Sequence, residues 1–253
     1  MKIAICFSGQ IRTGVQTAPN IKRYIGDLES VCDYFVHTWD HQSPNNAAHD
    51  LVPVDKSVFA DFYRLYNPIS MTVEPYANRK APAGVWGGFR VDPATGRKVH
   101  SMLESIYKSN RLKKTYEEDN GFVYDYVVRI RTDSVFHHEK SLRNDIGEHF
   151  GKTMTLSESD STFMAAFHQG ERPNKLEDIF WIARSTTMDK LAEFYHVRAD
   201  SGREPSDDTQ IHMATWIRDE LKLSFYPLSN SKIKLLRVNN AEHDVMNFDN
   251  VPI

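Results

Sequence analysis

Short apolar runs alternate with amphipathic segments along most of the chain. Residues 3–7 are continuously apolar, which is typical of a strand covered on both faces. Residues 17–30 carry apolar side chains at helical spacing, and residues 32–39 form a second strand-like run. A strand, a helix and a strand in this order predict two parallel neighbouring strands joined by a right-handed crossover.

This alternation continues to about residue 228. Amphipathic spacing predicts helices over residues 55–66, 102–119, 185–195 and 207–221. Apolar or alternating runs predict strands over residues 69–76, 124–130, 153–156, 179–183 and 223–227. Asn120-Gly121 is expected to end the second of these helices, and Ser185 to cap the third. We therefore predict an α/β fold, with a Rossmann-like, mostly parallel central sheet flanked by helices in a single domain over residues 1–253.

Two stretches break the pattern. Residues 77–100 concentrate glycine, proline and basic residues around Trp86 and Phe89. A loop of this length inside a compact domain predicts a flexible insertion, either a lid over a bound ligand or a surface loop without ligand contact. From about residue 239 the tail is polar and irregular.

Composition narrows the class of protein. Hydrophobic residues make up 40% of the chain and aromatic residues 11%, which excludes a disordered chain or a collagen-like fibre. The net charge of -3 gives no basic field, so no nucleic-acid partner is expected. No apolar run reaches the length of a membrane span or a secretory signal. Together with only two cysteines, Cys6 and Cys32, this predicts a cytoplasmic protein without a disulfide framework.

Polar residues follow the first strand, at the edge where open α/β sheets bind ligands. Ser8, Gly9, Gln10 and Arg12 come directly after residues 3–7. A glycine permits close approach of the backbone to a ligand, and an arginine can form a bidentate contact with phosphate. A solvated turn is the alternative interpretation.

The second strand ends in Thr38, Trp39 and Asp40. A tryptophan beside an aspartate can stack on a base, and the aspartate can pair with Arg12. Equally, Trp39 can belong to the core and Asp40 can begin a helix.

The strand over residues 124–130 leads into a charged cluster. Alternation places Arg129, Arg131 and Asp133 on one side. Charged side chains in an otherwise apolar strand are costly to bury without partners. Two arrangements satisfy them: a structural ion-pair network, or an anionic ligand, with or without a metal on Asp133.

Further acidic and imidazole groups occur late in the chain. Asp207 and Asp208 open the last predicted helix, where the helix dipole alone favours acids, and His243 lies in the polar tail.

In order along the chain, these segments resemble GT-A-type glycosyltransferase-like proteins of bacterial polysaccharide clusters and large phages. The resemblance rests on SGQ-x-R, DYFVHTWD, YDYVVRIRTD and the stretch from Asp178 to Met188, and it runs from residue 1 to about 228 without the insertion. It implies a GT-A-like domain in which the first strand's tip meets a nucleotide. It also implies that the fourth strand ends in an acidic motif, usually D-x-D, which holds a divalent metal and the sugar diphosphate.

The resemblance implies roles for individual residues. Those placed against the nucleotide, its ribose or its diphosphate are Ser8, Gly9, Gln10, Arg12, Thr38, Asp40, Arg129 and Arg131. Asp133, completed by His243, is implied as the ligand of Mn²⁺ or Mg²⁺, and Asp207 or Asp208 as the general base on the acceptor hydroxyl. The sequence departs from the family at Arg131, which stands where the first acid of the motif is usual. An arginine there can neutralise the departing diphosphate and make the metal dispensable.

The expected function is transfer of a sugar from a nucleotide-diphosphate sugar to a hydroxyl acceptor, such as a glycan. On this reading Lys108 and Asn110 either add contacts to the base or phosphate, or lie on a solvated helix face. The alternatives are a non-catalytic nucleotide-sugar-binding module of the same fold, and a transferase of phosphoryl or sulfuryl groups. The second alternative lacks support because the chain has no G-x-x-x-x-G-K-[ST] loop.

Overall fold

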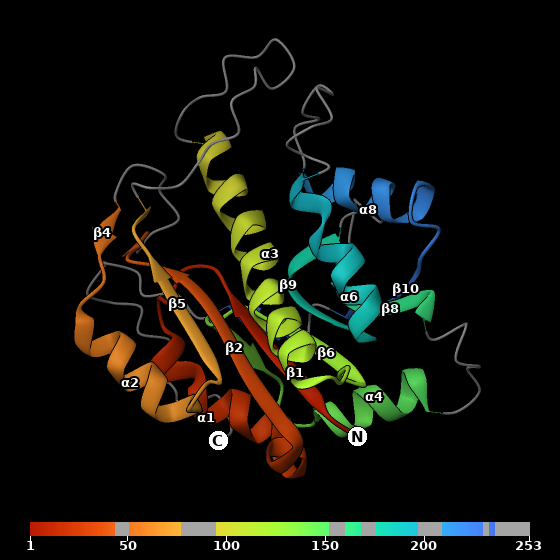
Figure 1. Ribbon diagram of the computed structural model, residues 1–253, viewed down its shortest axis with the longest axis horizontal. Helices are drawn as coiled ribbons and strands as arrows, with labels where there is room; N and C mark the ends of the chain where they lie inside the picture. The colour runs from red at the N-terminus through yellow and green to blue at the C-terminus, as the bar shows by residue number, and fades with distance from the viewer. Residues whose placement is uncertain are drawn as a thin grey trace.

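A seven-stranded sheet, in the order β10-β8-β9-β6-β1-β2-β5, organises the computed structural model (Figure 1). The structure describes residues 1–43, 51–76, 95–151, 160–167, 176–196, 209–229 and 233–235. The strands are β1 (Ile3–Ser8), β2 (Cys32–Trp39), β5 (Ser70–Glu74), β6 (Tyr126–Ile130), β8 (Thr162–Phe167), β9 (Leu176–Ala183) and β10 (Ser224–Ser229). Two small two-stranded sheets pair β3 (His41–Gln42) with β4 (Val52–Pro53), and β7 (Ser134–Phe136) with β11 (Ile233–Leu235).

The pairing is mostly parallel. β1 pairs in parallel with β2 and β6, β2 with β5, and β8 with β10, whereas β9 runs antiparallel to both of its neighbours. The prediction of an α/β fold with a mostly parallel central sheet flanked by helices is therefore confirmed.

Helices cover both faces of the sheet (Figure 1). They are α1 (Gly14–Ile25), continued by the 3₁₀ helix η1 (Gly26–Val31), α2 (Lys56–Tyr66), α3 (Thr95–Asn120), α4 (Leu142–Phe150), α6 (Ser185–Ala192) and α8 (Thr209–Asp219). Apolar side chains of α1, α2 and α4 pack on one face, and those of α3, α6 and α8 on the other. Among the described helices, none combines the length and apolarity needed to cross a membrane.

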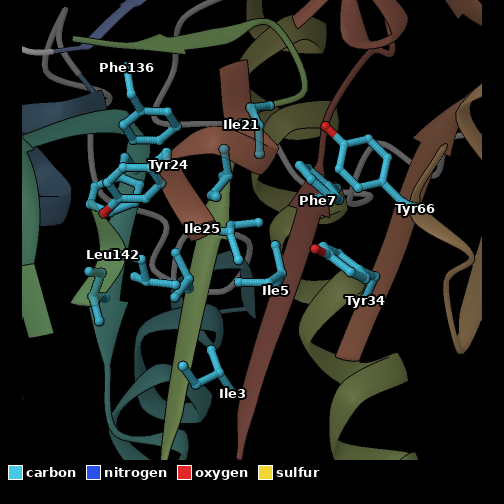
Figure 2. Close-up of a cluster of buried hydrophobic side chains, with 14 of the residues drawn as sticks. Ile3, Ile5, Phe7, Ile21, Tyr24, Ile25, Tyr34, Tyr66, Phe136 and Leu142 are labelled. Carbon is cyan, nitrogen blue, oxygen red and sulfur yellow. The ribbon is translucent and has the colours of Figure 1, made fainter. Parts of the chain in front are cut away.

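Aromatic and aliphatic side chains fill the core under α1. Figure 2 shows Ile3, Ile5 and Phe7 of β1 facing this cluster. The Tyr24 ring of α1 stacks on Phe136, with ring centroids 3.8 Å apart. Burying one large apolar side chain contributes about 1.5–3 kcal/mol, so this face anchors α1, and with it the loop between β1 and α1.

Local sequence signals fix several helix ends. The Asp55 side chain accepts a hydrogen bond from the Ser57 N–H and caps α2. Gly121 has a φ of +66° and follows the last residue of α3, as the Asn120-Gly121 signal predicts.

Other boundaries differ from the predictions. Helix α3 begins at Thr95 rather than Met102, so the end of the predicted insertion over residues 77–100 is helical. Residues 77–94, the predicted strand over 153–156 and the tail from 239 lie outside the described residues. Strands β7 and β8 and helix α4 were not predicted. β7 has three residues and α4 has nine of mixed polarity, so both carry a weak periodic signal, whereas the apolar run of β8, TFMAAF, was overlooked.

Ser185 is not a helix cap, and the prediction that it caps α6 is wrong. The cap position is Arg184, and the Ser185 hydroxyl donates a hydrogen bond to Glu117 of α3. It also accepts one from Lys113, which is fully buried and donates to Glu117 and Asp189 as well. These hydrogen bonds and ion pairs connect α3 with α6.

Lys113→Ala should lower the free energy of unfolding by about 3–5 kcal/mol, because it leaves the buried Glu117 without its cation and removes the nearer of the two lysines at Asp189. Lys114→Ala is the matched control, since Lys114 is more exposed and lies 3.6 Å from the same Asp189; it should cost less than about 1 kcal/mol. Urea denaturation of the two variants measures both values. Equal losses would show that the buried network does not stabilise the fold.

Candidate functional site

The polar residues of interest gather where the strand order reverses. The chain leaves β1 for β2 and β5 on one side and returns to β6 on the other. Ser8 pairs with His37, and Phe7 pairs with Ile130, so the carboxyl ends of the three central strands lie level. Ligands of open α/β sheets bind at such a switch point.

The loop after β1 has a backbone conformation that favours glycine. Gly9 has a φ of +107°, which a residue with a side chain rarely adopts. A Cβ atom at Gly9 would meet no heavy atom within 4 Å, so the constraint comes from the backbone and not from crowding. The Gly9 N–H donates a hydrogen bond to the Ser105 hydroxyl of α3, 2.6 Å away.

A buried arginine lies beneath this loop. Arg129 is 1% exposed, and its Nε donates to the Ser8 hydroxyl at 2.9 Å. The guanidinium also lies over the Trp181 ring, 5.3 Å from its centroid. Burial lowers the pKa of Arg129 to about 10, which still leaves it charged at neutral pH. Its terminal nitrogens, Nη1 and Nη2, have no hydrogen-bond partner among the described residues.

Asp133 holds two further arginines. Its carboxylate accepts two hydrogen bonds from Arg131, through Nε and Nη2, and one from Arg12 Nη1, each 2.9 Å long. Burial by itself would raise the pKa of Asp133, but the two guanidinium groups outweigh it and hold the pKa below its usual value. The Nη1 of Arg131 lies 3.5 Å from Asp178 of β9. Despite burial, these carboxylates raise the pKa of Arg131.

Asp133 does not face solvent. Its side chain is 1% exposed, and those of Arg12 and Arg131 are 17% and 16% exposed. The ion-pair network, one of the two arrangements that the sequence allowed, is therefore present. The cluster thus brings three guanidinium groups together with the carboxylates of Asp133 and Asp178, and Glu177 lies near enough to act on Arg131 electrostatically.

The described residues around Asp133 do not fit a resident divalent metal. Both of its oxygens already accept N–H groups from cations, and Mn²⁺ or Mg²⁺ would have to displace those groups and lie between positive charges. Among the described residues, no group of three His, Cys, Asp or Glu side chains is arranged to hold a metal ion. His243, implied as a second ligand, lies outside that part of the chain.

The turn after β6 is tied to the loop after β1. The Thr132 hydroxyl lies 2.8 Å from the backbone oxygen of Gln10 and 3.1 Å from that of Ile11, and its single proton is shared between these two acceptors. The Thr17 hydroxyl donates to the Thr132 backbone oxygen at 2.5 Å. The Gln10 side chain accepts a hydrogen bond from the Ser43 N–H. The two loops therefore form one rigid unit.

On the β2 side of Gly9 the polar groups form a second, uncharged contact. The Ser105 hydroxyl lies 2.8 Å from His37 Nδ1, and the His37 Nε2 lies 3.5 Å from a Glu74 oxygen. His37 is 1% exposed, and burial lowers its pKa to about 4, so the imidazole is neutral at pH 7. Ser105 thus holds the Gly9 N–H through a hydrogen bond, and His37 holds the Ser105 hydroxyl in place.

The other predicted residues of β2 and α3 have protein partners. Asp40 bonds to His41 Nδ1 and to the Tyr76 N–H, while Arg12 pairs with Asp133. Although burial opposes it, the bonds to His41 and Tyr76 lower the pKa of Asp40. Of the two interpretations of Trp39 and Asp40, the buried Trp39 is the one that the structure shows. Thr38 is fully buried.

The two predicted residues of α3 are also engaged within the protein. Lys108 pairs with Glu74 and Glu104, and Asn110 donates to Asp189.

The structure thus brings together seven of the predicted residues: Ser8, Gly9, Gln10, Arg12, Arg129, Arg131 and Asp133. Asp207 and Asp208 lie outside the described residues. Sequence reasoning gave no role to Ser105 or Asp178, which complete the site. A polar His37 between buried Phe35 and Trp39 was the signal that a partner such as Ser105 comes from α3.

Three solved glycosyltransferases are similar to this chain. A glycosyltransferase involved in glycosylation of the major capsid of PBCV-1 is 7% identical, with coverage of 91% of this chain and 83% of that one and a TM-score of 0.39. Mouse xyloside xylosyltransferase 1 is 10% identical, with coverage of 91% and 85% and a TM-score of 0.47. The galactosyltransferase LgtC, solved with donor and acceptor sugar analogs, is 9% identical, with coverage of 89% and 73% and a TM-score of 0.42.

With identities of 7–10% and TM-scores below 0.5, these likenesses are distant. Identities this low assign no donor or acceptor, so the function is argued from this chain's own residues. A scan against protein-family models and a search of the curated proteins give no match.

Asp133→Asn should lower the free energy of unfolding at pH 7 by about 3–5 kcal/mol, because two arginines lose their buried carboxylate. The pKa of Asp133 is lower in the folded state than in the unfolded chain. The wild type therefore loses this stability as the pH falls below about 4. The difference in the free energy of unfolding between wild type and variant should become smaller there. Urea denaturation at pH 7 and pH 3 tests both points.

The control for this measurement is Asp61→Asn, which removes an exposed partner of Arg64 and should cost less than about 1 kcal/mol. If Asp133→Asn is as stable as this control at pH 7, the ion-pair network does not stabilise the fold.

Ser105→Ala should cost about 1–3 kcal/mol, because the Gly9 N–H and the His37 imidazole lose a buried partner. Ser109→Ala is matched, since Ser109 is equally buried on the same helix but donates only to the Ile106 backbone oxygen. Thermal and urea unfolding compare the two variants. A loss from Ser109→Ala as large as that from Ser105→Ala would mean that the Gly9 contact contributes nothing.

Proposed function

We propose that this protein is a glycosyltransferase that moves a sugar from a nucleotide-diphosphate sugar to a hydroxyl acceptor, such as a glycan. The donor diphosphate lies against the loop after β1 and the turn after β6. The observation that carries the proposal is the cluster of Arg12, Arg129 and Arg131 at the switch point of the sheet, where guanidinium nitrogens of Arg12 and Arg129 have no hydrogen-bond partner among the described residues.

The chemistry of the reaction explains why such a cluster is useful. Breaking the bond between the sugar and the diphosphate leaves negative charge on the departing oxygen. Guanidinium groups that are already held in place stabilise that charge without reorganising during the reaction. Asp133 fixes Arg131 through two hydrogen bonds and Arg12 through a third, which is preorganisation of this kind.

The backbone of the loop after β1 also contributes to binding of the donor. With no side chain at Gly9, a phosphate or ribose can approach the chain closely. For the acceptor, the resemblance implies Asp207 or Asp208 as general base, which would take the proton from the attacking hydroxyl.

A second candidate is a non-catalytic nucleotide-sugar-binding module. Arg131 at the position of the first motif acid favours it, since a module that had lost its metal would tolerate the change. The two candidates differ in turnover and not in binding.

Saturation-transfer NMR with UDP, GDP and CMP tests the proposal, followed by donor hydrolysis with sugar derivatives of the nucleotide that binds. Binding with hydrolysis supports the enzyme, and binding without hydrolysis supports the module. If neither UDP nor GDP binds, both candidates fail, and binding of CMP alone would contradict a diphosphate donor.

Arg12→Gln should weaken binding of that nucleotide by about 10- to 100-fold, the range expected for loss of a charge-assisted hydrogen bond. The Arg131–Asp133 pair should persist in this variant. Arg64→Gln, which changes an exposed arginine of α2, is the control and should leave affinity unchanged. Calorimetric titration of both variants measures the effect, and equal affinities would exclude a phosphate contact at Arg12.

A further inference from the structure

The arginines occupy three of the roughly four acceptor positions of the carboxylate at the centre of the cluster. Three N–H groups from two guanidiniums converge on the two oxygens of Asp133. A metal ligand needs an oxygen lone pair directed toward the cation, and a divalent ion beside two guanidiniums is repelled by both.

Donors, in contrast, remain available. Arg129 Nη1 and Nη2 and Arg12 Nε are buried and have no hydrogen-bond partner among the described residues. Arg129 is 1% exposed, so these groups are shielded from solvent. Buried N–H groups of a charged side chain favour an anion that can accept from them. The cluster is therefore built for a negative ligand.

We propose that the arginines of this cluster, and not a divalent metal, neutralise the donor diphosphate. This inference rests on the proposed function. Arg131 occupies the place where a first metal-binding acid would stand. Asp133 is a positioning residue: it orients Arg12 and Arg131 toward the phosphates and does not ligate a metal.

Calorimetric titration of the nucleoside diphosphate that binds, either UDP or GDP, tests this in EDTA and in Mn²⁺. The affinity in EDTA should lie within about threefold of that in Mn²⁺, because an ion that bridges the phosphates would change it by about tenfold or more. Binding that weakens tenfold in EDTA would overturn the inference and leave the proposed function intact. Absence of binding in both buffers would overturn the proposed function itself.

Two variants separate the roles of the residues. Arg131→Asp should lose about 10- to 100-fold in affinity in EDTA, and Mn²⁺ should restore part of the loss, because two carboxylates then flank Thr132. Arg131→Gln should show the same loss with no response to Mn²⁺, and it supplies the comparison if Arg131→Asp does not fold. Wild-type affinity of Arg131→Gln in EDTA would overturn the inference.

Asp133→Asn distinguishes a positioning residue from a metal ligand. A positioning residue predicts the same fold-change in affinity in EDTA and in Mn²⁺, since misaligned arginines act in both buffers. A metal ligand predicts a loss confined to Mn²⁺, and that result would overturn the assignment. Circular dichroism of each variant confirms that folded protein is compared.

Discussion

The site depends on one buried ion-pair cluster, in which Asp133 bridges the loop after β1 and the turn after β6. Arg12 reaches it from the first loop, and Arg131 from the same turn. Breaking a buried pair of this kind is costly because it leaves an uncompensated charge, so neither loop can shift without the other. The Thr132 hydrogen bonds to Gln10 and Ile11 reinforce the same junction with neutral groups.

The apolar layers explain how charged groups are tolerated at that place. Arg129 follows Val127 and Val128, which are fully buried, and it faces Trp181 at the inner end of the cluster. Farther along the strand direction, Arg131 and Arg12 are partly exposed. The cluster thus runs from core to surface, which lets a bound anion remain partly hydrated while it meets fixed charges.

The sequence predicted the sheet because continuous apolar runs and helical spacing are local properties. It also located the candidate residues, since strand ends follow from the same pattern. It could not predict the burial of Asp133, because the partner Arg12 lies 121 positions away. Ser105 was missed because its role depends on the packing of α3 against β1 and β2. The cap prediction for Ser185 was wrong because its hydrogen-bond partners, Glu117 and Lys113, lie far away in the sequence.

The two sides of Gly9 differ in charge, and this difference suggests the kind of ligand that fits. On the β6 side, three guanidinium groups lie together, and the nitrogens that remain without a partner among the described residues are donors. On the β2 side, the Ser105 hydroxyl and a neutral His37 support the loop, and the nearby Lys108 is shared between the carboxylates of Glu74 and Glu104. An anion without a neutral part would use only the first side. A molecule that joins a diphosphate to uncharged groups matches both, which is the chemical character of a nucleotide-diphosphate sugar.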